Sequence, residues 1–132
     1  MTLPVDGKYD LAERAAKFGE SVIRLCRRIP LDVVSQTIIR QLVRSATSIG
    51  ANYMEANGAS SKKDFTNKIF ICKKESQETR YWLRMLASCT PTERQMIEGL
   101  GSECRELTLI FQKITSTLRK SSAAQAATNN EN

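Results

Sequence analysis

The residue types best suited to chemistry in this sequence are three carboxylates that could meet between helices, Glu55, Glu75 and Glu78. Carboxylates on facing helices can hold a metal ion, and helical-bundle metal sites combine them with histidines in Glu-x-x-His motifs. The 132-residue chain contains no histidine. Because Glu75 and Glu78 alone show only a common helical spacing, we predict no metal site and no cofactor.

The sequence also offers no convincing base for nucleophilic catalysis. Histidine is the usual partner of a reactive serine or cysteine, and its absence removes the Ser-His-Asp and Cys-His arrangements. The segment Gly99-Leu100-Gly101 lacks the preceding strand that a phosphate-binding loop requires. We therefore predict no catalytic residue and a protein that is not an enzyme.

Positive charge is the more informative chemical feature. Twenty Lys and Arg residues against 14 Asp and Glu residues give a net charge of +6, and residues 61–90, with seven basic and three acidic side chains, account for +4 of it. At 100° per residue, Lys62, Lys73, Arg80 and Arg84 form one basic stripe along an edge of the third helix. Such a surface attracts nucleic-acid phosphates. The candidate nucleic-acid-binding residues are Arg24, Arg27, Arg28, Lys62, Lys73, Arg80 and Arg84.

For a monomer, the alternative interpretation is that the basic residues form an ordinary solvated face. The arginines near the end of the first helix would then interact favourably with the helix dipole. An oligomer favours nucleic-acid binding, because it repeats the basic stripe in every subunit. Aromatic residues are scarce, at 6%, and we interpret Tyr81 and Trp82 as packing or interface groups and not as a platform for base stacking. Binding should therefore be directed at the backbone and show little sequence preference.

Four segments of helical periodicity must position these side chains. Apolar residues recur at steps of three and four within each segment. Asp32, Ser61 and Thr90 are predicted N-caps, and Gly58 is expected in the left-handed region at the end of the second helix. The expected helices span about 11–29, 32–57, 61–86 and 90–118.

No segment shows strand periodicity, so the predicted fold class is all-α. Connections of about two to five residues make neighbouring helices antiparallel, which gives an antiparallel up-down-up-down four-helix bundle. The last twelve residues lack large apolar groups and are expected to form a disordered tail. The predicted organisation is an N-terminal arm at 1–9, the bundle at 10–120 and the C-terminal tail at 121–132.

Polar residues beside the core stripes of the second and third helices should form a seam between them. With the turn centred near residues 58–61, antiparallel packing predicts an Arg44–Glu75 ion pair and an Asn52/Glu55–Lys68 cluster. Such groups are best known for fixing helix register. The predicted polar seam consists of Arg44, Asn52, Glu55, Lys68 and Glu75.

Further apolar residues lie outside the core stripes and predict self-association. Contiguous exposed apolar surface usually marks an interface, although scattered exposed apolar residues are normal on a monomer. We favour the interface. Its candidate residues are Ile39, Val43, Phe70, Tyr81, Trp82 and Met85.

The sequence also bears on location. The N-terminus has no secretory signal pattern, and no apolar run approaches the ~20 residues that a membrane span needs. Three of the four cysteines, Cys26, Cys72 and Cys104, occupy apolar-periodic positions, which is typical of reduced, buried thiols. We expect a cytoplasmic protein that does not associate with membranes.

Two motifs resemble a known family. The segment 44–56 (RSATSIGANYMEA) is followed by Lys63-Asp64-Phe65 and then by 74–83 (KESQETRYWL). Together with Asp10-Leu11-Ala12, these residues resemble the bacterial four-helix-bundle proteins encoded within 23S rRNA intervening sequences. The similarity covers about residues 9–120, although the fourth helix matches only by pattern.

The resemblance implies a bundle that assembles as a homopentamer, in a family whose molecular function is poorly defined. The related accessory proteins of diversity-generating retroelements form similar pentameric barrels, with basic surfaces that engage nucleic acid and a reverse transcriptase. We therefore expect a homopentamer that presents a basic surface to RNA or DNA. The alternative is a protein-interaction scaffold that docks an acidic partner protein on the same surface.

Overall fold

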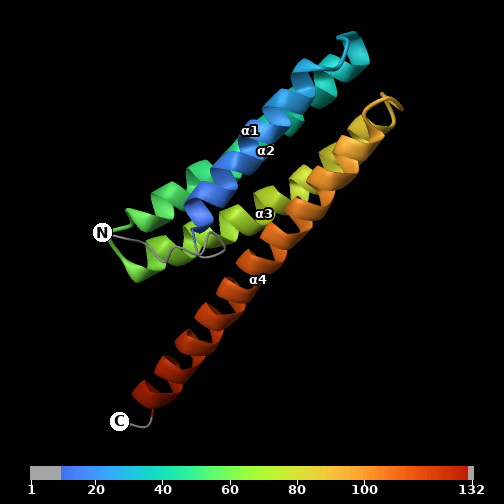
Figure 1. The fold of residues 1–132 in the computed structure, drawn as a ribbon. Helices are drawn as coiled ribbons and strands as arrows, with labels where there is room; N and C mark the ends of the chain where they lie inside the picture. The colour runs from blue at the N-terminus through green and yellow to red at the C-terminus, as the bar shows by residue number, and fades with distance from the viewer. Residues whose placement is uncertain (1–9, 131–132) are drawn as a thin grey trace.

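A computed structural model describes residues 10–130, and within that range the chain forms four α-helices and no strand. The helices are α1 (Leu11–Arg27), α2 (Val33–Asn57), α3 (Lys62–Ala87) and α4 (Arg94–Asn130) (Figure 1). The predicted all-α class is confirmed. The predicted N-terminal arm, residues 1–9, lies outside the described residues.

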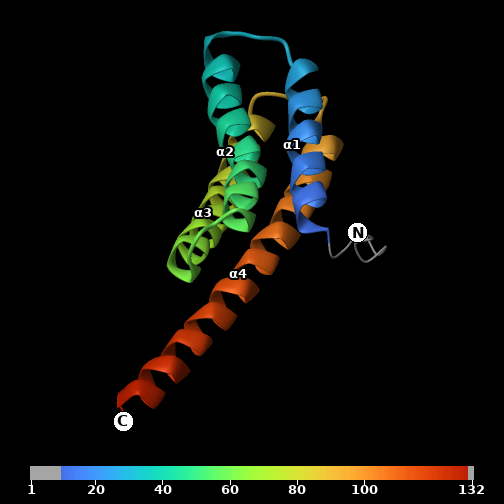
Figure 2. The same cartoon turned by 90° about the vertical axis from the view of Figure 1, so that its left-hand side faces the viewer.

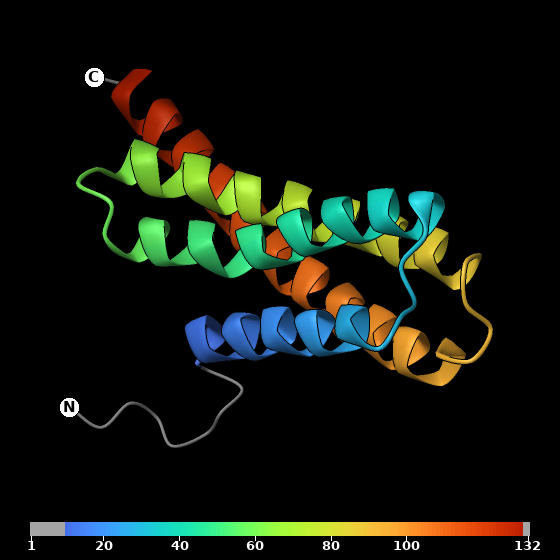
Figure 3. The same cartoon turned by 90° about the horizontal axis from the view of Figure 1, so that it is seen from above.

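Successive helices run antiparallel, and the ion pairs between α1 and α4 follow this arrangement. Arg14, early in α1, pairs with Glu103 well inside α4, whereas Arg28, just after α1, pairs with Glu93, just before α4. Short connections join the helices at alternate ends of the bundle (Figures 2 and 3). The α2–α3 pair packs most extensively and the α1–α4 pair least. The chain is thus an up-down-up-down four-helix bundle.

Polar side chains cap the start of three helices, and two of these caps, Asp32 and Ser61, were predicted. Asp10 Oδ1 accepts a hydrogen bond from the Glu13 backbone N–H (3.0 Å) and caps α1. Asp32 and Ser35 exchange bonds in a capping box at α2, and Ser61 accepts the Asp64 N–H at α3. Each cap satisfies an N–H group that has no partner within the helix.

Two expectations about helix ends are wrong. Gly58 has a φ of −97°, outside the left-handed region, and its N–H bonds to the carbonyls of Met54 and Glu55 at 3.3 and 3.2 Å. Helix α4 begins at Arg94, not after Thr90. The buried Thr90 hydroxyl shares a 3.1 Å hydrogen bond with Thr92 Oγ1 and caps nothing.

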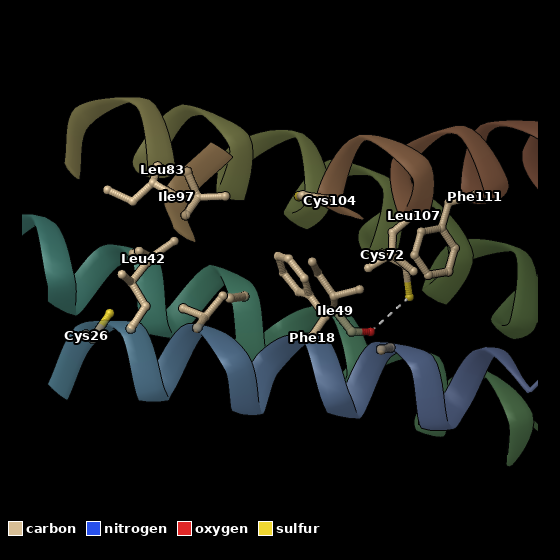
Figure 4. Packing of buried hydrophobic residues seen from close by; sticks show 14 of the residues in the cluster. Phe18, Cys26, Leu42, Ile49, Cys72, Leu83, Ile97, Cys104, Leu107 and Phe111 are labelled. Carbon is tan, nitrogen blue, oxygen red and sulfur yellow. Dashed lines mark hydrogen bonds between the residues drawn. The ribbon is translucent and has the colours of Figure 1, made fainter. Parts of the chain in front are cut away.

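The core runs along the bundle axis and receives side chains from all four helices (Figure 4). Phe111, Leu107 and Ile49 are fully buried. Two of the three buried cysteines bond to the backbone, Cys72 Sγ to the Ile49 carbonyl (3.5 Å) and Cys104 Sγ to the Ser76 carbonyl (3.1 Å). Burial raises the pKa of Cys72 and Cys104 to about 12. These thiols therefore pack as small apolar groups.

The C-terminal segment departs from the predicted disordered tail, because α4 continues to Asn130 and extends beyond the other helices (Figure 1). Residues 119–129 are all exposed. The lack of large apolar groups therefore prevents packing, whereas the four alanines between 123 and 127 and the absence of Gly and Pro after 101 still favour helix. Although α4 has 37 residues, none of the described helices has an apolar stretch sufficient to cross a membrane.

Candidate nucleic-acid interface

An open groove of about 680 Å³ lies between the C-terminal half of α3 and the first turns of α4. Arg80 and Arg84 line it from α3, and Arg105 lines it from α4. We call this site the arginine groove. Gln77 and Ser102 add polar side chains to its lining, and Gly101 leaves it open, because a Cβ atom there would meet nothing within 4 Å.

The arginine groove has a positive charge that nearby carboxylates do not cancel. Three arginines and Glu98 line it, which leaves a formal charge of +2. The three arginine side chains are exposed, and none forms an ion pair with another described residue. An arginine guanidinium that has no carboxylate partner can donate two parallel N–H hydrogen bonds to a phosphate. The groove can therefore bind anions.

The structure spreads the predicted α3 stripe along the whole helix. Arg80 and Arg84 share the groove, but Lys62 lies about 33 Å from Arg84 along the helix axis. Lys62 Nζ instead donates to Ser121 Oγ at 3.3 Å, beside the C-terminal part of α4. Lys73 is half-buried between these ends. The stripe is therefore a line of charge whose Arg80–Arg84 end lines the arginine groove.

The three predicted arginines at the end of α1 have different surroundings. Arg28 pairs with Glu93 (3.2 Å), and Arg24 donates to Ser21 Oγ (3.0 Å). Arg27 lines a separate apolar groove on the α1–α2 side. This cluster therefore presents less free positive charge than the sequence suggested.

Arg105 is the groove residue that the sequence analysis missed. It lies one helical turn after Gly101 on α4. In the sequence, residues 98, 101, 102 and 105 form a helical flank beside the apolar stripe, and this pattern could have indicated Arg105. Periodicity identifies such a flank. It does not identify the helix that the flank will face.

The polar seam between α2 and α3 contains the expected ion pairs. Arg44 Nη1 lies 3.2 Å from Glu75 Oε2, and Lys68 Nζ lies 3.1 Å from Glu55 Oε1. Glu78 joins the seam as a second partner of Arg44. Asn52, expected in the Glu55–Lys68 cluster, instead donates to the Ser48 carbonyl of its own helix (2.8 Å).

The three glutamates considered for a metal site each pair with a cation of the seam. Glu55 faces Lys68, while Glu75 and Glu78 both face Arg44. Within residues 10–130, no three His, Cys, Asp or Glu residues come together in a way that could hold a metal ion.

The candidate interface residues lie on two faces. Ile39 and Val43 line an apolar groove of about 440 Å³ on the α1–α2 side. It lies beside the α1–α2 turn, where Leu31, Val33 and Val34 are 68%, 84% and 63% exposed. These three residues were not among the predicted interface residues, although they lie within four positions of Pro30.

The remaining candidates lie on α3, where Phe70, Trp82 and Met85 are half-buried. The Arg119 guanidinium covers the Phe70 ring at 5.0 Å, and Trp82 Nε1 donates to Glu78 Oε2 at 3.2 Å. Tyr81 is 53% exposed and lines the arginine groove. These positions are thus separate from the apolar groove of Ile39 and Val43.

The fold and surface define a class of protein: antiparallel four-helix bundles whose described surface offers a basic groove and an exposed apolar face. The chain belongs to the 23S rRNA-intervening sequence protein family, whose model matches residues 7–113. This confirms the resemblance seen in the two sequence motifs.

A solved relative has the same fold. The chain is similar to a protein of unknown function from the S23 ribosomal protein family of Bacteroides thetaiotaomicron VPI-5482, whose crystal structure aligns with a TM-score of 0.68 and 29% identity. The alignment covers 80% of this chain and 97% of that one. No curated protein matches the chain. The family match ends at residue 113, so the last turns of α4 lie beyond it.

Proposed function

We propose that this protein is a non-enzymatic subunit of a homo-oligomer that binds RNA or DNA through the phosphate backbone at the arginine groove. The observation that best supports the proposal is the groove itself, where Arg80, Arg84 and Arg105 from two helices line one concave surface. Backbone contacts position a nucleic acid without reading its bases, so little sequence preference is expected.

Self-association brings several copies of the arginine groove together in one particle. The exposed Leu31, Val33 and Val34 beside the groove of Ile39 and Val43 support an interface between copies. The resemblance to a pentameric family makes a homopentamer the assembly that we propose. Five copies at +6 each have a formal charge of +30, which raises the local concentration of polyanions at the surface.

A cytoplasmic location fits this proposal. Cys26, Cys72, Cys89 and Cys104 are all free thiols, and disulfides are rare where the cell keeps thiols reduced.

The test is a salt titration of binding to labelled random-sequence RNA and DNA. Between about 50 and 200 mM salt, the logarithm of the binding constant should fall linearly with the logarithm of the salt concentration. The variant R80E/R84E/R105E should bind much more weakly and show a shallower slope. The single variants R80E, R84E and R105E should each weaken binding more than Arg40→Glu, which makes the same charge change at an exposed position on α2.

Absence of wild-type binding at low salt would contradict the nucleic-acid proposal. Docking of an acidic partner protein would then be the better explanation of the arginine groove. Light scattering tests the assembly separately: a pentamer has five times 14.8 kDa, about 74 kDa, and a stable monomer would contradict it.

A further inference from the structure

Tyr81 gives the arginine groove a feature that phosphate binding alone does not require. The residue is 53% exposed and lies on the groove beside Arg80 and Arg84. Among the residues that the structure describes, it is the one aromatic side chain that is more than half exposed. Phe70, also on α3, has the Arg119 guanidinium over its ring. The groove therefore combines cations with a single accessible ring.

The Tyr81 ring is held in place by its neighbours. It packs against Trp82 in a T-shaped contact, with ring centroids 5.0 Å apart and an interplanar angle of 77°. Trp82 is itself fixed, because its Nε1–H donates to Glu78 Oε2 (3.2 Å), and Glu78 pairs with Arg44. The polar seam thus orients Trp82, and Trp82 supports Tyr81. A ring supported in this way loses little conformational entropy when a ligand stacks on it.

An exposed ring beside arginines discriminates between forms of nucleic acid. In a duplex, the base faces are stacked on one another and only the backbone and base edges are accessible. In a single strand, a base can stack on an aromatic ring while cations hold the neighbouring phosphates. Stacking tolerates any base, since every base has a π face.

We propose that the arginine groove prefers single-stranded nucleic acid, with one base stacked on Tyr81 and adjacent phosphates bound by Arg80, Arg84 and Arg105. This inference rests on the proposed function and adds the form of the ligand. Glu98 lines the same groove, and its negative charge repels phosphates. The nucleic-acid backbone is therefore expected to bind on the arginine side of the groove.

The experiment measures fluorescence anisotropy of labelled oligouridylate, oligodeoxythymidylate and a duplex of equal length with wild type and Tyr81 variants. Tyr81→Ala should weaken single-strand binding about tenfold, in the range found for loss of one stacked base, and leave duplex binding unchanged. Tyr81→Phe keeps the ring and should bind like wild type. Met54→Ala, an exposed residue on α2, is the control and should change neither affinity.

Three outcomes would overturn the preference for single strands. If Tyr81→Ala weakens single-strand and duplex binding equally, or weakens neither, no base stacks on the ring, while backbone binding at the arginines still stands. If Tyr81→Ala lowers the mass measured by light scattering, the ring belongs to a subunit interface. If the wild type binds no nucleic acid, this inference fails together with the proposed function.

Discussion

At the scale of single residues, Arg44 has the most consequential position outside the core. It pairs with Glu75, whose side chain is only 10% exposed, and with Glu78, which holds Trp82. Exposed ion pairs contribute little to stability. A nearly buried carboxylate that loses its cation is different, because its charge remains in a poorly solvated place.

Arg44→Ala should therefore lower the free energy of unfolding by about 1–2 kcal/mol, more than a surface pair would explain. Urea denaturation of the purified protein measures this. Arg40→Ala, one turn earlier on α2 and exposed, should change stability by less than about 0.5 kcal/mol. Equal effects of the two substitutions would show that the Arg44 pairs add nothing specific.

The Arg14–Glu103 pair makes stability depend on pH. The Arg14 side chain donates to Glu103 at 2.8 Å, and this bond is the main cause that lowers the pKa of Glu103. A carboxyl with a lower pKa in the folded state stabilises the protein above its unfolded pKa, near 4.3. That stabilisation is lost as the pH falls through the folded value.

Wild type should accordingly be more stable than Glu103→Gln at neutral pH, and the difference should shrink between about pH 5 and pH 3. Thermal unfolding of both proteins across this range measures the effect. A difference that stays constant with pH would mean that the carboxylate charge has no part in it.

At the scale of helices, α4 has a weak start and an unsupported end. Gly99 and Gly101 lie in its first turns, and a Cβ atom at either position would meet nothing within 4 Å. Glycine costs about 1 kcal/mol relative to alanine inside a helix. At the other end, no side chain between 119 and 129 is buried.

Gly99→Ala should raise the free energy of unfolding by about 0.5–1 kcal/mol, since it favours helix without a clash. The urea midpoint should increase with no change in slope. Gly58 lies just after α2 and not within a helix, so Gly58→Ala should raise the free energy of unfolding less. A loss of stability in Gly99→Ala would contradict the open environment of this position.

Removal of residues 121–132 should leave the unfolding midpoint within about 0.5 kcal/mol of wild type, because no core contact is lost. The helical signal in circular dichroism should fall, since exposed helical residues are removed. A clear drop in the midpoint would show that the segment packs on the bundle or on another copy.

At the scale of the whole molecule, the two proposed surfaces lie on different sides of the bundle. The arginine groove lies between α3 and α4, while the apolar groove and the exposed turn lie on α1 and α2. Subunits can thus associate through one side and leave the other free for nucleic acid. This separation makes the two functions separable by mutation.

Leu31→Glu should reduce the mass measured by light scattering, because it places a charge in the apolar surface that we assign to the interface. Leu109→Glu makes the same change at a similarly exposed leucine on α4 and should leave the mass unchanged. If neither substitution alters the assembly, the subunits associate through another surface.

Much of the architecture could be predicted from the sequence. Four apolar stripes defined the helices, and short connections made them antiparallel. The position of the α2–α3 turn then placed Arg44 level with Glu75, and that ion pair is present. The helices follow from periodicity and capping chemistry, and the level of Arg44 and Glu75 follows from the position of the short turn between two antiparallel helices.

The arginine groove was decided by tertiary structure. Arg105 joins Arg80 only because of the way α4 is rotated about its axis and crosses α3, and Asn52 bonds within its helix although a cluster across the seam was expected. Helix rotation and crossing depend on how all core side chains fit together at once. Local sequence therefore determined which helices form and in what order, whereas packing of the whole core determined which side chains share a surface.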